Sequence, residues 1–468
     1  MVFSSLVFLF AFLPLAITSY YLFRNRTYRN AVLLVFSLLF YSWGEPRFIV
    51  LILLASLAAY LGGLLLDHFA RRQKPGLKKL IFVVTVVLLT SNLLVFKYLN
   101  FFSDNLNLLF PGALSLPRLV LPIGISFYTF QILSYVIDLY RGEIKVQKNY
   151  FYLTLYVSFF PQLIAGPIVR YQTIEDEILH RQESFEGVVK GVKRFLTGLA
   201  KKVLIANNTA LIAEIIYKGD PAVYGTLFYW VAALSYALQI YFDFSGYSDM
   251  AIGLGQMFGF HFLENFNYPY TALSVTDFWR RWHISLSTWF RDYIYIPLGG
   301  NRVKRSRWIF NLLVVWALTG FWHGAQWNFL LWGLYYGVIL LLEKLVLDKF
   351  LQKLPKLLRW CYAMFVVLIG WVIFNLTDPG QMGYALKMMF SFTPTQFPEL
   401  LMADTSLVKG LLYLPLGLVF SFPIFRRLKA PESTLGLALE NAVYLGILAA
   451  CIVFIVSATY NPFIYFRF

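Results

Sequence analysis

Apolar runs alternate with short stretches rich in lysine and arginine along almost the whole chain. A helix that crosses a bilayer needs about 20 apolar residues and satisfies its own backbone hydrogen bonds in lipid. The alternation therefore predicts a polytopic all-α membrane protein with about 11 membrane segments, some of them re-entrant. The expected apolar segments are residues 3–23, 31–43, 48–66, 80–96, 119–140, 150–165, 224–260, 308–344, 358–375, 408–425 and 436–458.

Between these runs the sequence predicts loops and one surface helix. Residues 98–118 are expected to form an outer loop and residues 167–187 a loop or re-entrant elbow, and a loop of about 30 residues is expected to follow Asn375. In 188–205, apolar residues share one face and lysines and arginines occupy the rest, which indicates a basic amphipathic helix at the cytoplasmic interface. It is either a positive-inside anchor or a patch for the phosphates of a cytosolic donor.

Basic residues follow the first, third and fifth apolar segments, so they return to one side of the membrane. They are Arg24, Arg26 and Arg29, then Arg71, Arg72, Lys74, Lys78 and Lys79, and then Arg141, Lys145 and Lys148. Cytoplasmic loops carry the excess of lysine and arginine. Both termini are therefore predicted to be extracytoplasmic.

Composition supports a membrane protein and limits its partners. Of the 468 residues, 59% are hydrophobic and 19% aromatic, well above soluble proteins. A formal charge of +16 would suggest nucleic acid in a soluble protein. Here the basic residues lie between apolar runs and indicate topology and lipid headgroup contacts. We expect one integral-membrane domain over 1–468, with membrane lipid but no nucleic acid as partner. Two cysteines in apolar runs indicate neither a metal site nor a disulfide framework.

His323 lies inside the long apolar segment from Trp308 to Lys344, beside Trp322. This segment is too long for one crossing and predicts a helical hairpin that turns near Gly324–Trp327. A titratable group at membrane depth costs free energy, so His323 is a candidate functional residue. The alternative is a histidine that hydrogen-bonds to a backbone carbonyl inside the bundle.

A second histidine, His283, lies in the segment before the hairpin, residues 277–297. Its arginines are too costly in lipid and a proline ends it, so it predicts a short helix embedded at the cytoplasmic side. Trp279, His283 and Ser287 would form one row on that helix. A neutral imidazole can take a proton from a hydroxyl nucleophile, so two histidines suggest acid–base chemistry. An interfacial anchor is the alternative for such a helix.

Carboxylates in other apolar segments keep a different class of function open. Asp138 lies on a polar face of 119–140, and Asp243 and Asp249 interrupt 224–260. Buried carboxylates and histidines form proton paths in membrane proteins. A proton-coupled transporter without covalent chemistry is therefore the competing hypothesis, and it predicts proton-dependent flux and no acyl-enzyme.

Five blocks of sequence carry a resemblance to a known family. They are FWRRWHISLSTWFRDYIYIPLGGNR, TGFWHGAQWNF, LPIGISFYTFQILSYVIDLYRG, FFPQLIAGPIVRY and YFDFSGYSDMAIGLG. These blocks resemble the membrane-bound O-acyltransferase (MBOAT) family in its bacterial AlgI/DltB-like branch, and the resemblance runs from about Val2 to the last residue. Tyr336 stands where several alginate enzymes of this branch have a histidine, which leaves alginate itself open as the substrate.

The resemblance implies a ring of membrane helices around a central tunnel, which a thioester donor enters from the cytoplasm. It implies that His323 in WHG is the essential residue and that His283 in RRWH is the second. The tail resembles the FIYFxF ending of this branch and implies that Tyr465 relays the acyl group, with an aromatic interface belt as the alternative. The substrate-binding residues expected beside them are Arg280, Arg281, Trp282, Trp322 and Asn311.

On this resemblance the chain is expected to be an acetyltransferase of the bacterial cytoplasmic membrane. It would take acetyl from acetyl-CoA, hold no cofactor tightly, and serve O-acetylation of an exported polysaccharide such as cellulose or alginate. The implied partners are an extracytoplasmic acetyltransferase and the polysaccharide export or synthase machinery. Transfer of D-alanine from a carrier protein to teichoic acid, and of acetyl to peptidoglycan, are the alternatives inside the family.

Overall fold

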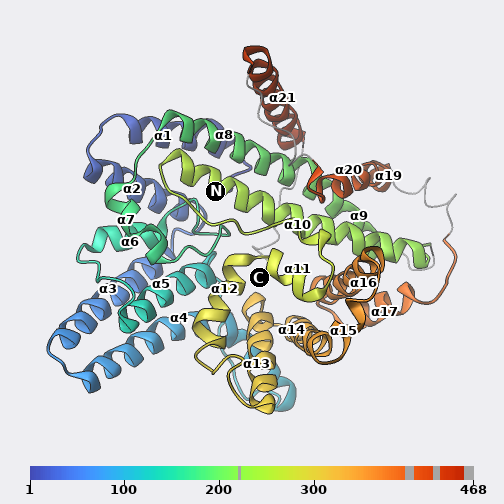
Figure 1. Ribbon diagram of the computed structural model, residues 1–468, viewed down its shortest axis with the longest axis horizontal. Coiled ribbons are helices and arrows are strands. Elements are labelled where there is room, and N and C mark those ends of the chain that lie inside the picture. The colour runs from blue at the N-terminus through green and yellow to red at the C-terminus, as the bar shows by residue number, and fades with distance from the viewer. Residues whose placement is uncertain (220–222, 396–404, 425–432, 458–468) are drawn as a thin grey trace. The chain divides into compact units, whose positions relative to one another are not determined.

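The computed structural model describes residues 1–219, 223–395, 405–424 and 433–457, so Tyr465 lies outside the described residues. The described part of the chain is helical and contains no strand, which confirms the all-α class (Figure 1). It divides into two compact units. Unit 1 is Met1–Phe195 with Met250–Leu263, and unit 2 is Leu196–Asp249 with Glu264–Phe468. One domain over the whole chain stays a prediction.

Unit 1 is built from apolar helices of unequal length. They are the π-helix η1 (Phe8–Phe12), α1 (Leu13–Tyr21), α2 (Arg26–Gly44), α3 (Ile49–Arg71), α4 (Pro75–Leu109), α5 (Ile125–Arg141), α6 (Tyr150–Ser158), α7 (Tyr171–His180) and most of α8 (Phe185–Ala200). Helices α3, α4 and α5 pack against one another, and α6 packs against α2 and α3. This group runs from blue to green in Figure 1.

The outer loop expected over 98–118 is wrong in its first half, because α4 continues through it. Polar residues near the start of this stretch have partners beside the helix. Lys97 Nζ donates to Ser126 Oγ at 3.0 Å. The side-chain amide of Asn100 exchanges two hydrogen bonds with the backbone of Leu119, at 2.8 and 3.1 Å. Because Ser126 and the backbone of Leu119 supply these hydrogen bonds, the polar side chains are satisfied while the helix continues.

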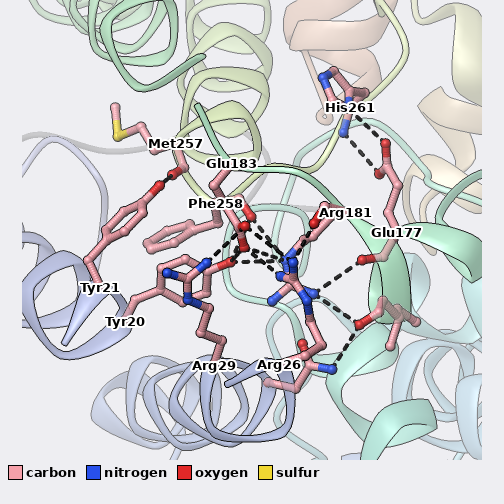
Figure 2. Close-up of polar contacts among 12 residues, drawn as sticks. Tyr20, Tyr21, Arg26, Arg29, Glu177, Arg181, Glu183, Met257, Phe258 and His261 are labelled. Atoms are coloured by element: carbon pink, nitrogen blue, oxygen red, sulfur yellow. Dashed lines mark hydrogen bonds and ion pairs between the residues drawn. The ribbon is translucent and has the colours of Figure 1, made fainter. Parts of the chain in front are cut away.

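A group of charged and phenolic side chains ties the connection after α7 to the N-terminal helices of unit 1 (Figure 2). Glu183 accepts a hydrogen bond from Arg26 Nη1 at 2.5 Å and another from the hydroxyl of Tyr20. Arg29 Nη1 lies 2.8 Å from the second carboxylate oxygen, and the buried Arg181 donates to Tyr20 Oη at 3.0 Å. We call these five residues the Glu183 cluster.

The Glu183 cluster holds its carboxylate in the ionised form. Burial opposes ionisation of Glu183, but the hydrogen bonds from Arg26 and Tyr20 outweigh burial and lower its pKa to about 2. The cluster therefore holds the connection after α7 against α1 and α2, through charges that are paired at neutral pH.

Unit 2 contains the predicted hairpin and the aromatic-rich segments before it. Its helices are the end of α8, the π-helix η2 (Lys201–Ala206), α9 (Asn207–Lys218), α10 (Thr226–Met257, which ends in unit 1), the 3-10 helix η3 (Pro269–Thr271), α11 (Val275–Arg281), α12 (Ile284–Phe290), the π-helix η4 (Arg291–Tyr295), α13 (Arg305–His323), α14 (Trp327–Leu342), the π-helix η5 (Glu343–Leu347), α15 (Asp348–Leu351), α16 (Lys356–Asn375), α17 (Pro379–Met389), α19 (Thr405–Leu411), α20 (Tyr413–Phe420) and α21 (Thr434–Ser457). Helix α14 packs against α13 and α16, and α11 contacts both α14 and α16.

The hairpin predicted over 308–344 is confirmed as α13 and α14, with its turn at residues 324–326. The two helices come close because glycine faces the partner backbone. A Cβ built on Gly320 would lie 2.1 Å from the carbonyl oxygen of Phe329, a distance that no side chain could accommodate. His323 is the last residue of α13, so it stands at the turn.

The single helix expected over 277–297 is wrong. The helix is interrupted between α11 and α12, and we call this interruption the break. There His283 adopts φ of 44° in the left-handed region. The backbone of residues 265–267 bonds to both helix ends at this break, with N···O distances of 2.9 and 3.0 Å. These long-range bonds replace those of a continuous helix, so the predicted row of Trp279, His283 and Ser287 does not form.

Three other expected segments differ in detail. Residues 167–187 contain the helix α7, and the long loop expected after Asn375 contains α17, which Asp378 caps by accepting from the backbone N–H of Gln381 at 2.7 Å. The segment 408–425 is divided into α19 and α20 in its described part. Local interactions such as the Asp378 cap set the ends of these helices, and hydropathy does not indicate them.

Five of the described helical stretches are long and apolar enough to cross a membrane. They are Ile49–Arg71, Pro75–Leu109, Trp327–Leu351, Lys356–Asn375 and Thr434–Ser457. They confirm a multi-pass membrane protein. The count of about 11 segments is not confirmed, and the ring, the tunnel and the side on which each terminus lies stay predictions.

Candidate functional site

A cavity of about 280 Å³ lies within unit 2. Its walls come from α11, α12, η4, α13, the end of α14 and η5. Helices α11 to α14 are labelled in Figure 1. Four of the residues predicted from the sequence line it, namely His283, His323, Arg280 and Trp282. The break after α11 and the turn after α13 thus place both histidines in the wall of one cavity. Most of the other lining residues lie between the two histidines in the chain.

His283 is buried at the break and is held from two directions. Its ring packs at 90° on Phe244 with centroids 4.6 Å apart, and Nδ1 lies 3.1 Å from Oδ1 of Asn265. Burial lowers the pKa of His283 to about 3, so the imidazole is neutral at pH 7. Both helices beside it have seven residues, too few to span a membrane.

His323 is 4% exposed and is enclosed by aromatic rings. Its ring meets Trp332 at 87° and Phe374 at 82°, with centroids 5.1 and 5.2 Å apart. Trp322 lies between the two histidines, with centroids 6.1 Å from His283 and 5.0 Å from His323. These edge-to-face contacts limit rotation of the imidazole and keep bulk water away from it.

An aromatic cluster extends from the histidines toward α14 and α16. Trp279 packs on Tyr336 and on Trp316 with centroids 4.8 and 4.9 Å apart, and Trp282 packs on Trp371 at 4.8 Å. Tyr336, which departs from the family pattern, is fully buried in this cluster. The cluster makes a dry, rigid wall on which polar interactions are stronger than in water.

The charged part of the cavity wall is basic. Arg280, Arg291 and Lys344 line the cavity and are exposed. Arg291 pairs with Asp292 at 2.7 Å, and Lys344 Nζ lies 4.9 Å from the ring centroid of Trp308. Within the described residues no group of three or more His, Cys, Asp or Glu side chains could hold a metal. We call Arg280, Arg291 and Lys344 the basic edge of the cavity, and their positive charges suit an anion such as a phosphate.

The other predicted binding residues do not reach the cavity. Arg281 turns to Asp277 and binds it at 2.9 Å. Asn311 is fully buried and donates to the carbonyl oxygens of Leu298 and Gly300, at 3.0 and 3.3 Å, so it fixes the glycine turn before α13. Neither they nor Trp322 belong to its lining, and the role of each in substrate binding stays a prediction.

Glu343 supports the cavity wall through Thr276, and the sequence pattern did not indicate this role. It is 3% exposed and accepts from the backbone N–H groups of Val275 and Thr276, at 2.6 and 2.9 Å, and from the hydroxyl of Thr276 at 2.6 Å. It therefore anchors the start of α11 to η5. In the sequence it is a carboxylate at the edge of an apolar run, a position that is also typical of the end of a membrane segment.

Two of the three carboxylates of the transporter hypothesis, Asp243 and Asp249, are paired with lysines in unit 2. Lys202 Nζ lies 2.5 Å from Asp243, and Lys201 Nζ lies 2.6 Å from Asp249. Neither aspartate lines the cavity of the two histidines. Two lysines of the expected basic helix 188–205 therefore neutralise buried acids, and they are not free to bind a donor.

Comparison with known proteins identifies a family that covers most of the chain. A model of the membrane-bound O-acyltransferase family matches residues 38–378. The chain is 40% identical over its whole length, and over the whole length of the relative, to the "Probable alginate O-acetylase AlgI" of Pseudomonas putida.

Two further relatives act on other polymers by name. The chain is 34% identical to the peptidoglycan O-acetyltransferase of Helicobacter pylori, over 80% of this chain and 77% of the relative. It is 30% identical to the teichoic acid D-alanyltransferase of Bacillus subtilis, over 51% of this chain and 61% of the relative. The similarity to the acetyl-transferring relatives is thus both longer and higher.

Proposed function

Because the chain belongs to the membrane-bound O-acyltransferase family, we propose that it moves acetyl from cytosolic acetyl-CoA across the membrane for O-acetylation of an exported polysaccharide. The acceptor is a glycan hydroxyl, as in alginate or cellulose. The protein is an O-acyltransferase, so the transporter hypothesis is set aside. The donor, the acceptor and the direction of transfer are the parts that need testing.

One observation carries this proposal: His283, His323 and Arg280 line one cavity with aromatic walls. A group-transfer site needs a base near the nucleophile and a place for the charged donor. The two imidazoles supply the first requirement, and the basic edge suits the phosphates of coenzyme A.

In the proposed chemistry His323 is the general base. A hydroxyl oxygen attacks the thioester carbonyl carbon while His323 takes the hydroxyl proton, and the carbon–sulfur bond breaks. The thiolate of coenzyme A then takes the proton from the imidazolium and leaves as the thiol. Because His323 ends α13, the negative end of the helix dipole stabilises the transient imidazolium.

Acetyl is favoured over D-alanyl by the extent of similarity. Relatives named as acetyl-transferring enzymes match all or four fifths of the chain, whereas the D-alanyltransferase of Bacillus subtilis matches about half. Peptidoglycan remains the second candidate acceptor because a peptidoglycan O-acetyltransferase is among these relatives.

We further propose the bacterial inner membrane as the location and an extracytoplasmic acetyltransferase, working with the polysaccharide export or synthase machinery, as the partner. Tyr465 would hold the acetyl group between donor and acceptor. A phenol can carry an acyl group when a base removes its proton. Tyr465 lies outside the described residues, so this relay is argued only from the resemblance of the tail.

The test uses the purified full-length chain in lipid vesicles with radiolabelled acetyl-CoA. We would measure thiol release and label on the protein for the wild type, His323→Ala, Tyr465→Phe and the matched tail variant Tyr460→Phe. We expect thiol release by the wild type and its loss in His323→Ala. Label lost in Tyr465→Phe but kept in Tyr460→Phe would support the relay.

Other outcomes change the proposal in distinct ways. If label survives Tyr465→Phe but not His323→Ala, the enzyme stands without the relay. If the wild type releases no thiol from acetyl-CoA but accepts an acyl group from an aminoacylated carrier protein, acetyl-CoA is the wrong donor. If purified alginate, cellulose and peptidoglycan fragments are compared as acceptors with the partner present, the labelled polymer identifies the substrate.

A further inference from the structure

The side chain of Asn265 meets His283 at the break between α11 and α12. Asn265 is fully buried, and its Oδ1 lies 3.1 Å from His283 Nδ1. The same oxygen accepts from the backbone N–H of Ser285 at 3.1 Å and from the Ser285 hydroxyl at 2.9 Å. On the other side, Asn265 Nδ2 donates to Ser248 Oγ at 3.2 Å.

The orientation of the Asn265 amide follows from its fixed partners. A backbone N–H can only donate, so the amide atom that faces the N–H of Ser285 must be the oxygen. The Ser285 hydroxyl can rotate and does not determine the orientation. The oxygen that faces His283 is therefore an acceptor, and the ring nitrogen 3.1 Å from it donates a proton to it. The Ser285 hydroxyl also lies 3.4 Å from this nitrogen, but it donates to the Asn265 oxygen at the shorter distance of 2.9 Å. With an unprotonated Nδ1, two lone pairs would oppose each other.

We propose that Asn265 is a positioning residue that holds the imidazole of His283 as the Nδ1–H tautomer, so that Nε2 offers its lone pair to the cavity. In a neutral imidazole one nitrogen donates and the other accepts. His283 Nε2 is buried without a hydrogen-bond partner among the described residues, and His283 lines the cavity.

The surroundings of His283 keep the ring neutral. Burial lowers the pKa of His283 to about 3. The charged side chains that line the same cavity are the cations Arg280, Arg291 and Lys344, and these also disfavour a second positive charge. Phe244 holds the ring from the side of α10 with an edge-to-face contact.

This tautomer restricts what His283 can do to a substrate. A lone pair accepts a hydrogen bond or a proton, so the group that meets Nε2 is an N–H or O–H donor. An amide of the pantetheine arm or the acceptor hydroxyl satisfies this requirement, whereas the thioester carbonyl oxygen does not. His283 then positions the substrate through a donor group and does not polarise the thioester. The statement about the substrate rests on the proposed function, and the tautomer does not.

The first test is spectroscopic and needs no activity. The full-length chain has five histidines, so ¹⁵N-histidine labelling in lipid nanodiscs gives a simple solid-state NMR spectrum, and His283→Gln identifies the His283 signals. At pH 7 and without substrate we expect a protonated Nδ1 and an unprotonated Nε2. A ring protonated at Nε2, or at both nitrogens, would overturn the inference.

The second test separates positioning from packing. Ser248→Ala removes another contact of Asn265 without touching His283. We expect this variant to keep the tautomer and a turnover of acetyl-CoA near that of the wild type. Asn265→Ala should lose the fixed tautomer and reduce kcat about 100-fold, the low end for a positioned acid–base group.

Two results would contradict the role of Asn265. One is an unchanged tautomer in Asn265→Ala, and the other is a loss in Ser248→Ala as large as that in Asn265→Ala. If the wild type shows the expected tautomer but turns over neither acetyl-CoA nor a carrier-bound acyl group, the proposed function fails while the assignment of the tautomer stands.

Discussion

Two buried polar regions of this protein use their side chains in opposite ways. In the Glu183 cluster of unit 1, Arg26, Arg29 and Tyr20 converge on one carboxylate that stays ionised (Figure 2). His283 lines the cavity of unit 2 and has a neutral imidazole, and its buried Nε2 has no hydrogen-bond partner among the described residues.

The difference shows which polar group serves stability and which is available for chemistry. A buried charge with several partners gains from each of them, and removing one leaves the others uncompensated. A buried acceptor without a partner costs free energy in the empty site and gains only when a substrate supplies the missing donor. Substitutions in the Glu183 cluster should therefore lower the free energy of unfolding. Substitutions at the cavity should lower activity and leave the protein folded.

The largest expected effect is on catalysis. His323→Gln should reduce thiol release from acetyl-CoA by about 100- to 10,000-fold, the range for loss of a general base. The unfolding temperature should stay near that of the wild type, because Gln has a similar shape and keeps a polar end. Thiol release and thermal unfolding would be measured on the same preparation. A large fall in unfolding temperature with little loss of thiol release would reverse the comparison.

Glu183→Gln should have the opposite signature. Removing one partner of a buried ion pair costs about 3 kcal/mol, which we expect as a lower free energy of unfolding in denaturant titrations. Thiol release per folded molecule should remain near that of the wild type. Glu186→Gln is the matched control, because Glu186 is exposed and forms an ion pair with Lys190 of the same helix. A control variant as unstable as Glu183→Gln would show that the arginines are not the cause.

The pH dependence of stability sharpens the same contrast. The folded-state pKa of Glu183 is about 2, below its ordinary value of 4.5, so the ionised carboxylate stabilises the fold above about pH 4.5. That stabilisation is lost as the pH falls through the interval toward 2. The unfolding temperature of the wild type should therefore drop more between pH 5 and pH 3 than that of Glu183→Gln. Parallel curves would mean that Glu183 is not held ionised.

The smallest expected effect separates two adjacent arginines. Arg280 lines the cavity, whereas Arg281 binds Asp277. Arg280→Gln should raise KM for acetyl-CoA roughly fivefold, equal to about 1 kcal/mol for an exposed charge-assisted contact. Arg281→Gln should leave KM unchanged in steady-state assays of thiol release. Equal increases in both variants would mean that only the general positive charge of the region matters.

Much of the fold was predictable because membrane helices need long apolar runs. The hairpin α13–α14 followed from an uncharged segment too long for one crossing, and its turn lies where Gly324 was expected to place it. The motifs around His283 and His323 also marked the two histidines before any geometry was known. These features are local in sequence, so the pattern of residues is sufficient to find them.

The break at His283, the contact with Asn265 and the anchor at Glu343 depended on the tertiary structure. Each joins residues that are far apart in the chain, such as Glu343 and the backbone of Val275. The periodicity of 277–297 favoured one continuous helix, but backbone groups of residues 265–267 compete for the same hydrogen bonds. By itself the sequence determined which segments are apolar and which residues carry chemistry. The tertiary structure determined which of those residues share a cavity, because only folding brings distant hydrogen-bonding partners together.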